Sequence, residues 1–359
     1  MKYFTIVVLI FSVLAALDRI FGSRLGLGKE FEKAFNLLGA MALSMIGMIV
    51  ISPVIADLMK PISEFLSNTL HIDASIIPAS LFANDMGGAP LSVEMASNEE
   101  IGLFNALVVS SMMGCTISFT IPFALGVVLK EQHKDLLSGL LCGIVTIPVG
   151  CIVSGIMCKI PFFSLLVTLL PLIVFAGIIA FGLICFPDMS VKIFKIFGAI
   201  ITILITVGLS LGIINFLLKD DFIKGLASVE EGASICVNAA VVLSGSFPMV
   251  FALTKFLSRP LGFIGKKIGV NEFSVVGILS GMASSATLFG MMDRMDKKGV
   301  MMNAAFSVSG AFVLGSHLAF TMAFDERYIA PVIVGKLISG ILAAALAGVI
   351  FSKQNKQEN

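Results

Sequence analysis

IGLFNALVVSSMMGCTISFTIPFALGVVL, residues 101–129, decides the fold: the stretch is apolar and carries no Asp, Glu, Lys or Arg. A helix crosses a hydrocarbon core about 30 Å thick with about 20 such residues. Six other uncharged segments reach that length: Asn36–Ala56, Leu136–Cys158, Ile160–Pro187, Ile196–Leu218, Gly232–Thr254 and Gly299–Phe324. Two more apolar segments, Tyr3–Leu17 and Tyr328–Ser352, lie near the ends of the sequence. The sequence therefore predicts an all-α polytopic membrane protein.

The composition excludes several classes of function. Only 13% of the residues are charged, whereas a soluble domain carries about 25%, and the mean hydropathy is +1.04. A net charge of +1 offers no basic surface for nucleic acid. The chain has no P-loop and no H-E-x-x-H sequence. We therefore expect no enzyme, no cofactor and no metal site.

Two segments are long enough to span but are interrupted by small and polar residues. The first, Ile72–Ala96, contains Asn84-Asp85-Met86-Gly87-Gly88. The second, Phe273–Met292, contains Ser280-Gly281 and Ser284-Ser285. Irregular backbone at membrane depth is tolerated only where protein buries it or where it lines a cavity. Both segments are therefore predicted to be broken, with functional groups near the breaks.

The distribution of Lys and Arg indicates how these two segments lie in the membrane. If both re-enter, the cytoplasmic loops hold 17 basic residues and the outside holds 6. If both span, the count is 12 against 11, which shows no bias. Because cytoplasmic loops are enriched in Lys and Arg, we expect nine spanning helices, two re-entrant segments, an external N-terminus and a cytoplasmic C-terminus.

Residues 34–158 and 230–352 repeat the same order of elements. Each half has a Pro-containing helix, a broken segment, a helix with an early Asn (Asn105, Asn303) and a final Gly-rich helix. Residues 1–33 form a first membrane helix and loop, 159–229 connect the halves, and 353–359 form a cytoplasmic tail. In the re-entrant topology the repeats are inverted, which is typical of secondary transporters whose sites lie where the broken helices meet.

The polar groups inside the apolar segments are the candidates for a site. Asp85 lies in the first break, where Gly87 and Gly88 allow a turn and a close approach of the backbone to a ligand. A carboxylate at membrane depth is costly, and a bound cation would offset the cost. The alternative places Asp85 in a loop tip in water. Glu94 is either a second site carboxylate or a solvated charge.

Three further residues belong to the candidate set. His317 is either a packing residue or a group that contacts ligand or protons. Lys336 either extends to the membrane surface or pairs with Asp85 or Glu94 in place of a coupling cation. Met113 flanks the proposed site. Phe119 and Phe320 occupy matching places in the two halves and form either a cation–π wall or core packing.

Many ordered motifs make the sequence similar to the ethanolamine-utilisation transport family, EutH, of bacterial ethanolamine operons. The motifs are Ala40–Gly47 with Pro53, Asp85-Met86-Gly87-Gly88 with Glu94, Ser111-Met112-Met113-Gly114 with Pro122 and Leu125-Gly126, Gly143–Pro148, Pro248-Met249, Phe289–Met292, Leu314-Gly315-x-His317-Leu318 and Val334–Ile338. They run through nearly the whole chain. Ser284, Ser285 and Ser316 look like departures from the family pattern.

The resemblance implies a permease or facilitator for ethanolamine in the bacterial plasma membrane, feeding ethanolamine catabolism. Its partners are then ethanolamine and the lipid bilayer, and a homo-oligomer stays open. Ethanolamine is mostly protonated at neutral pH, so Asp85 would pair with its ammonium group. Asn84 or Ser284 and Ser285 would bind its hydroxyl group.

Three other interpretations remain. A cation-coupled secondary transporter for another small polar solute fits the same architecture. An intramembrane enzyme is disfavoured by the missing motifs. A sensor or structural subunit would show no flux and would tolerate the loss of Asp85.

Overall fold

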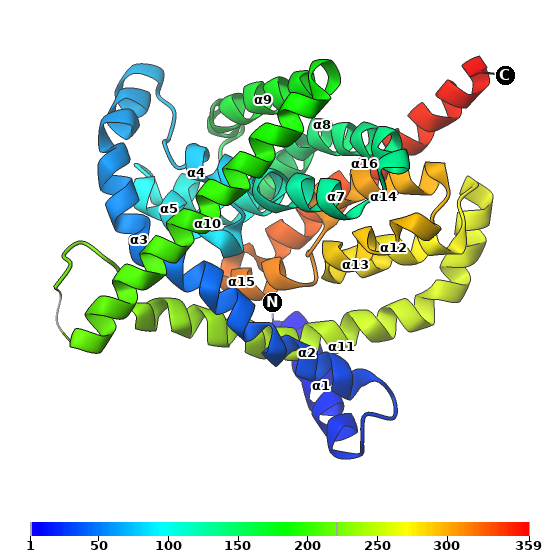
Figure 1. The fold of residues 1–359 in the computed structure, drawn as a ribbon, viewed down its shortest axis with the longest axis horizontal. Coiled ribbons are helices and arrows are strands. Elements are labelled where there is room, and N and C mark those ends of the chain that lie inside the picture. The colour runs from blue at the N-terminus through cyan, green and yellow to red at the C-terminus, as the bar shows by residue number, and fades with distance from the viewer. Residues whose placement is uncertain (1, 220–221, 359) are drawn as a thin grey trace.

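The computed structural model describes the backbone of residues 2–219 and 222–358, and their side chains except those of 2–3, 257–262, 264, 266 and 355–358. The regular secondary structure of this part of the chain is all helical, without strands (Figure 1). The α-helices are α1 (Lys2–Ile20), α2 (Leu27–Asn36), α3 (Leu38–Phe65), α4 (Ile76–Leu81), α5 (Gly88–Met95), α6 (Glu99–Phe104), α7 (Ile121–Val127), α8 (His133–Met157), α9 (Phe162–Cys185), α10 (Pro187–Leu218), α11 (Val229–Ile268), α12 (Glu272–Ala283), α13 (Ser285–Phe289), α14 (Lys297–Gly310), α15 (Ser316–Phe324) and α16 (Ile329–Glu358). Shorter helical turns are η1 (Leu66–Leu70), η2 (Asn84–Met86), η3 (Asn105–Gly114), η4 (Thr116–Thr120), η5 (Lys130–Gln132), η6 (Met292–Arg294) and η7 (Glu326–Tyr328).

Seven helical stretches in the described residues are long and apolar enough to cross a membrane. They are Leu27–Leu70, Glu99–Val127, Lys130–Met157, Phe162–Cys185, Pro187–Leu218, Val229–Phe256 and Glu326–Gln354.

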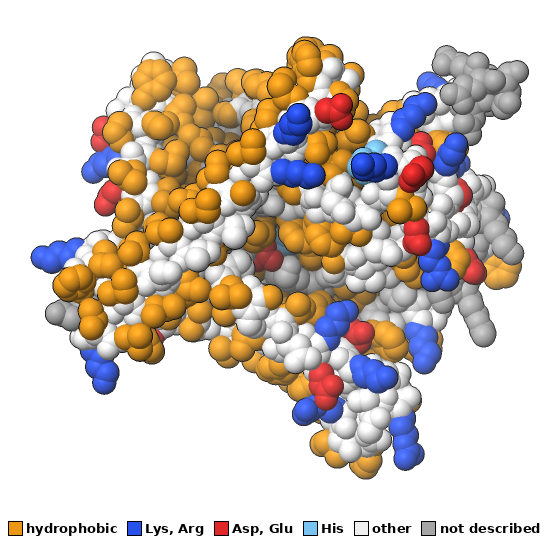
Figure 2. All heavy atoms as spheres, in the orientation of Figure 1, with side chains coloured by type: hydrophobic (Ala, Val, Ile, Leu, Met, Phe, Trp, Pro, Cys, Tyr) orange, Lys and Arg blue, Asp and Glu red, His pale blue; other side chains and the backbone are white. Residues whose placement is uncertain are grey.

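The surface of these helices is apolar where a bilayer requires it. The most apolar window of α10 has a mean hydropathy of 2.4, yet the protein buries only 22% of that window. Hydrophobic side chains cover α3 and α10 on the face shown in Figure 2. An exposed apolar surface of this extent needs hydrocarbon around it. The chain is therefore an all-helical polytopic membrane protein.

The first broken segment lies where the sequence predicts it. The 3-10 turn η2 separates α4 from α5, and Gly87 joins them with φ of 97°. This left-handed conformation carries little cost only for glycine. A Cβ on Gly87 would overlap the Cγ of Met48 and lie 2.6 Å from its Cβ. The turn that carries Asp85 is therefore packed directly against α3.

The prediction of one continuous helix over Gly299–Phe324 is wrong, because α14 and α15 are separated by non-helical backbone in which Phe312 has φ of 59°. The reason lies in α12, since the last carbonyl groups of a helix have no partner inside it. The carbonyl oxygens of Gly281 and Met282 accept hydrogen bonds from the N–H groups of Phe312 and Leu314, at 3.0 and 2.8 Å. The backbone of the break after α14 thus donates hydrogen bonds to the last carbonyl groups of α12.

The apolar stretch 101–129 is also irregular. Residues of η3 and η4 form π-helical turns, and every residue of η3 is buried. π-helical turns are rare, and those that occur are often found at functional sites. A Cβ on Gly114 would overlap the carbonyl oxygen of Phe82. The under-wound helix therefore packs backbone against backbone on the first break.

Asn105 and Asn303 each hold one of the two broken segments. The Asn105 Nδ2 donates to the Ser75 Oγ at 2.8 Å, immediately before α4. The Asn303 Nδ2 donates to the Ser274 carbonyl at 2.8 Å, in the first turn of α12. Each bond ties the start of a broken segment to the helix that follows it.

The helices that follow the breaks are also capped alike. The Asn98 Oδ1 accepts from the Ile101 N–H at 3.0 Å at the start of α6. The Asp296 Oδ2 accepts from the Gly299 N–H at 3.3 Å at the start of α14. Both are side-chain N-caps of the ordinary kind. Asn98 and Asp296 differ by 198 in residue number, as Asn105 and Asn303 do.

Helices α8, α14 and α16 form the most closely packed part of the fold. A Cβ on Gly139 of α8 would lie 2.7 Å from the Cβ of Ala304, and one on Gly150 would lie 2.7 Å from the Gly335 carbonyl oxygen. The Ser339 Oγ donates to the Ser309 Oγ at 2.8 Å between α16 and α14. Small residues at these contacts let the helix backbones approach closely, as is usual in membranes.

Candidate functional site

A cavity of about 300 Å³ lies where the broken segments meet. Its lining comes from α2, α3, η2, η4, α11, the junction of α12 with α13, and the break before α15 together with the first turn of α15. The lining residues are Lys33, Leu37, Ala40, Met41, Ser44, Ala83, Asp85, Met86, Cys115, Phe119, Leu243, Phe247, Ala283, Ser284, Ala286, Phe312, Ser316 and His317. The face shown in Figure 2 is hollowed near its centre, and acidic atoms are visible at the floor of the hollow. The volume suits a small ligand.

Among the described residues that line this cavity, Asp85 is the one carboxylate. Its side chain is 17% exposed, whereas His317 beside it is only 1% exposed. The His317 Nε2 lies 3.8 Å from the Asp85 Oδ1, too far for a hydrogen bond. The Ser316 side chain hydrogen-bonds to the Asp85 carboxylate. No Lys or Arg nitrogen of the described side chains lies within 4.0 Å of Asp85.

Aromatic rings form the walls of the cavity. Phe119 and Phe312 meet edge to face with ring centroids 5.6 Å apart, and the Phe312 ring lies 5.1 Å from the His317 ring. Phe247 lines another part of the cavity, and the Lys33 Nζ lies 5.3 Å from its ring centroid. A primary ammonium group is thus already placed over an aromatic face at this site, which is a favourable cation–π arrangement.

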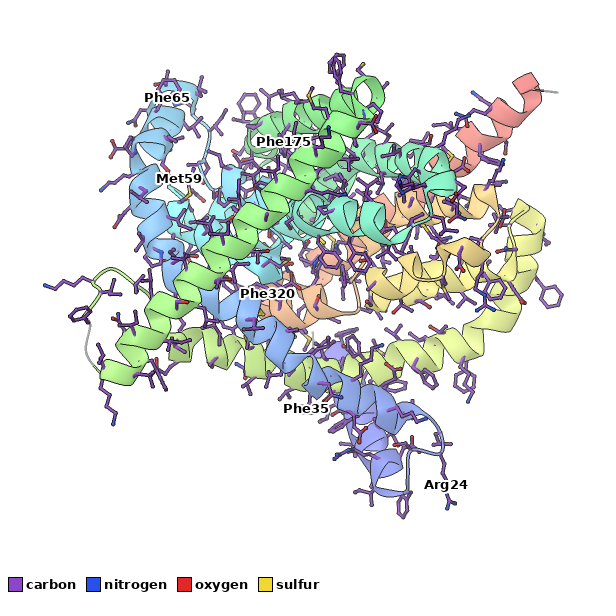
Figure 3. The ribbon with its side chains drawn as sticks, viewed as in Figure 1. Arg24, Phe35, Met59, Phe65, Phe175 and Phe320 are labelled. Carbon is purple, nitrogen blue, oxygen red and sulfur yellow. The ribbon has the colours of Figure 1, made fainter. Side chains whose placement is uncertain are left out.

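Of the two alternatives for Phe119 and Phe320, cavity wall and core packing, each residue follows a different one. Phe119 lines the cavity. Phe320, labelled in Figure 3, is 1% exposed and stacks on Phe324 at 5.3 Å in the interior of the fold. Phe312 takes the place opposite Phe119 because the unpredicted break before α15 turns its ring toward the cavity.

The structure brings together three of the predicted site residues as lining: Asp85, Ser284 and His317. Four others lie in the protein just behind the breaks and are buried: Asn84, Gly88, Met113 and Ser285. Gly87 shapes the turn next to Asp85. Glu94 is exposed on α5 and does not line the cavity.

Several of these buried polar atoms have no hydrogen-bond partner among the described residues. They are the Asn84 Oδ1 and Nδ2, the Ser285 Oγ and the His317 Nδ1. A buried polar group without a partner costs about 1–3 kcal/mol. Such a concentration near one carboxylate marks a place for water or a polar ligand.

Lys336 is the most deeply buried charged side chain of the described residues, with 1% exposure. Its Nζ donates to the Ser111 carbonyl oxygen at 2.5 Å, within the π-helical run η3. The side chain therefore does not extend to the membrane surface. It interacts electrostatically with Asp85 and His317 but makes no direct ion pair with Asp85.

The sequence interpretation missed Lys33, Phe247, Phe312 and Ser316 as parts of the site. Ser316 stood out in the sequence only as a departure from the family pattern. The other three carry no local signal in the sequence. Lys33 is one of several basic residues in a predicted loop, and Phe247 and Phe312 are two of 30 phenylalanines. In the described residues no group of three or more His, Cys, Asp or Glu side chains could hold a metal ion.

Comparisons with known proteins agree on one family. The profile described as "EutH: Ethanolamine utilisation protein, EutH" matches residues 1–350. A "Probable ethanolamine permease EutH" of Listeria monocytogenes serotype 1/2a is 40% identical over 350 residues, covering 98% of this chain and 94% of the relative. The protein of the same name from Salmonella typhimurium is 34% identical over 387 residues, covering 97% and 95%.

A third relative is the "Uncharacterized protein YxeR" of Bacillus subtilis, 34% identical over 348 residues, with 97% of this chain and 94% of the relative covered. No solved structure matches the chain. The family profile and all three of these relatives, each above 30% identity, cover almost the whole chain. The chain therefore belongs to the EutH family of ethanolamine utilisation proteins.

Proposed function

We propose that the protein is an ethanolamine permease of the bacterial plasma membrane and that its central cavity binds the protonated substrate. The names of the two permease relatives support the substrate. The substrate is a small amino alcohol with one cationic end and one hydroxyl end. A site for it needs one anion, a surface that tolerates a cation, and partners for a hydroxyl group.

The observation that carries the proposal is Asp85 at the cavity. Its carboxylate is partly exposed to the cavity and has no Lys or Arg within 4.0 Å in the described part of the chain. A carboxylate at membrane depth costs about 2.5–3.5 kcal/mol on insertion scales. An ammonium ion beside it offsets that cost, and the rings of Phe119, Phe247 and Phe312 stabilise the same cation.

The hydroxyl end has partners from both broken segments. Ser284 lines the cavity from the second break, and Ser316 lines it next to Asp85. The Asn84 side chain and the Ser285 hydroxyl lie behind the lining without partners. We assign the substrate hydroxyl to Ser284, with Asn84 and Ser285 as the neighbouring polar groups that a substrate or its water would engage.

A finer topology belongs to the same proposal: nine crossings, two re-entrant broken segments, an external N-terminus and a cytoplasmic C-terminus. The halves 34–158 and 230–352 would then be inverted repeats. The shared spacing of 198 residues for Asn98 and Asp296, and for Asn105 and Asn303, supports this. Cysteine labelling from either side of the membrane, with single cysteines in the loops, tests the orientation.

Uptake of labelled ethanolamine into proteoliposomes tests the function, and Asp85→Asn tests the site. A charge-assisted contact is worth about 1.5–3 kcal/mol, so we expect apparent affinity to fall by at least about tenfold. Glu94→Gln is the matched control, because this exposed carboxylate is nine positions away and lies outside the cavity. It should transport as the unchanged protein does.

The outcomes separate the hypotheses. Saturable uptake that is lost in Asp85→Asn and kept in Glu94→Gln supports both the permease and the site. Equal uptake by Asp85→Asn refutes the site. Absence of ethanolamine flux, together with gradient-driven flux of another small polar solute, would favour the cation-coupled secondary transporter instead.

A further inference from the structure

Lys336 is a positive charge that the binding of ethanolamine does not explain. It lies in the candidate span Glu326–Gln354, is 1% exposed, and donates to the backbone carbonyl of Ser111. A buried ammonium at membrane depth is expensive and usually functional. A permease for a cation has no evident use for a fixed positive charge next to its binding site, since like charges repel.

The groups around Lys336 define the charge of the site. Its electrostatic partners are Asp85 in η2, His317 in α15, Cys115 between η3 and η4, and Cys151 in α8. Thiols and imidazole, with ordinary pKa values of about 8.5 and 6.5, are mostly uncharged at neutral pH. Asp85 and Lys336 therefore balance each other, as Lys33 of the cavity lining and Glu30 do at 3.3 Å, and the empty site is close to neutral.

A bound ethanolammonium ion changes this balance. The site would then hold two cations and one carboxylate, with an unbalanced charge in surroundings of low dielectric constant. A lysine relieves the imbalance because its amine readily loses a proton when buried, whereas an arginine does not. The proposed function puts the incoming ammonium at Asp85, and no Lys or Arg nitrogen of the described residues lies within 4.0 Å of that carboxylate.

We infer that Lys336 is an internal counter-ion that releases its proton when ethanolammonium binds at Asp85 and regains one when the substrate leaves. One cation enters the site as one proton goes to the solvent, so the charge of the site is unchanged. Transport then exchanges ethanolammonium for a proton and should not respond to the membrane potential. This inference rests on the proposed function of the cavity.

Isothermal titration calorimetry of the purified full-length protein with ethanolamine hydrochloride, in two buffers of different ionisation enthalpy, counts the protons released. For the unchanged protein at neutral pH we expect about one proton to be released per substrate bound. The observed binding enthalpies in the two buffers should therefore differ by about the difference between the two ionisation enthalpies of the buffers. Lys336→Met should bind without a buffer effect. Lys336→Arg should bind at least about tenfold more weakly, because its charge cannot leave.

Lys353→Met is the matched control, since Lys353 lies on the same helix, α16, but is exposed and does not line the cavity. It should keep the proton release. Binding by the unchanged protein with the same enthalpy in both buffers overturns the inference and leaves the permease standing. Proton release by Lys336→Met, or full affinity in Lys336→Arg, overturns it as well. No binding by the unchanged protein refutes the site itself, and the inference with it.

Discussion

Gly87→Ala should damage the site without touching a substrate-binding side chain. The residue has φ of 97°, and a Cβ there would overlap the Met48 Cγ and lie 3.1 Å from its Sδ. A side chain held in an unfavourable backbone region costs about 1–3 kcal/mol. Overpacking of a filled core costs about 1–3 kcal/mol more. Alanine also lowers the conformational entropy of the unfolded chain, which offsets about 0.4–1 kcal/mol of this destabilisation.

The expected net destabilisation is therefore about 1–5 kcal/mol. Asp85 lies two residues before Gly87 in the same turn, so uptake of ethanolamine should fall together with stability. Thermal unfolding of the purified protein in detergent and uptake into proteoliposomes measure the two effects. Gly177→Ala is the matched control, because a Cβ there meets nothing within 4 Å, and alanine favours a helix interior.

A double-mutant cycle separates strain from overlap. Met48→Ala removes the Cγ and Sδ that the new methyl group would meet, although Met48 is fully buried and its truncation is itself destabilising. In the Gly87→Ala background the same truncation should cost less than it does alone. Equal stability and uptake of Gly87→Ala and the unchanged protein, or a cycle with no coupling, would refute the geometry of this turn.

Three further predictions concern the surroundings of the site. Asn303→Ala removes hydrogen bonds to the Ser274 and Gly299 carbonyls, at 2.8 and 2.9 Å, and should lower the unfolding free energy by about 1–3 kcal/mol; unchanged thermal unfolding would contradict this. Gly139→Ala should destabilise the contact of α8 with α14 by about 1–3 kcal/mol in the same assay, whereas Gly126→Ala, with open space at its Cβ, should be nearly neutral. Burial raises the pKa of Asp325, but hydrogen bonds from Arg327 outweigh it and the pKa is lowered from 3.8. The stabilisation is therefore present above pH 3.8 and is lost as the pH falls below it, so Asp325→Asn should flatten the acid side of the melting-temperature profile; an unchanged profile would show that the pair contributes nothing.

The sequence was sufficient for the class of fold and for the position of the first break. Uncharged length identifies a membrane helix because the bilayer acts on every residue of the span. The glycines beside Asp85 mark a turn because the required backbone conformation is local. Both properties can be recognised without knowing what the segment contacts.

The break after α14 could not be predicted in the same way. Its cause is a set of carbonyl groups at the end of α12, which are far away in the sequence. The cavity lining could not be predicted either, since Lys33, Phe247 and Phe312 come from three different parts of the chain. For Lys336 the sequence left two alternatives open, and the structure favours burial over extension to the membrane surface because its Nζ contacts the Ser111 carbonyl.

The close contacts of α8 with α14 and α16 restrict how the protein moves. Helices whose backbones interlock through glycines, as at Gly139 and Gly150, cannot slide along one another without steric collision. The three helices should therefore travel as one rigid body during a transport cycle, and hydrogen exchange should be slowest along their shared faces. Relative motion is then left to the elements that surround the cavity, where the breaks and the π-helical turns provide positions at which the backbone can bend.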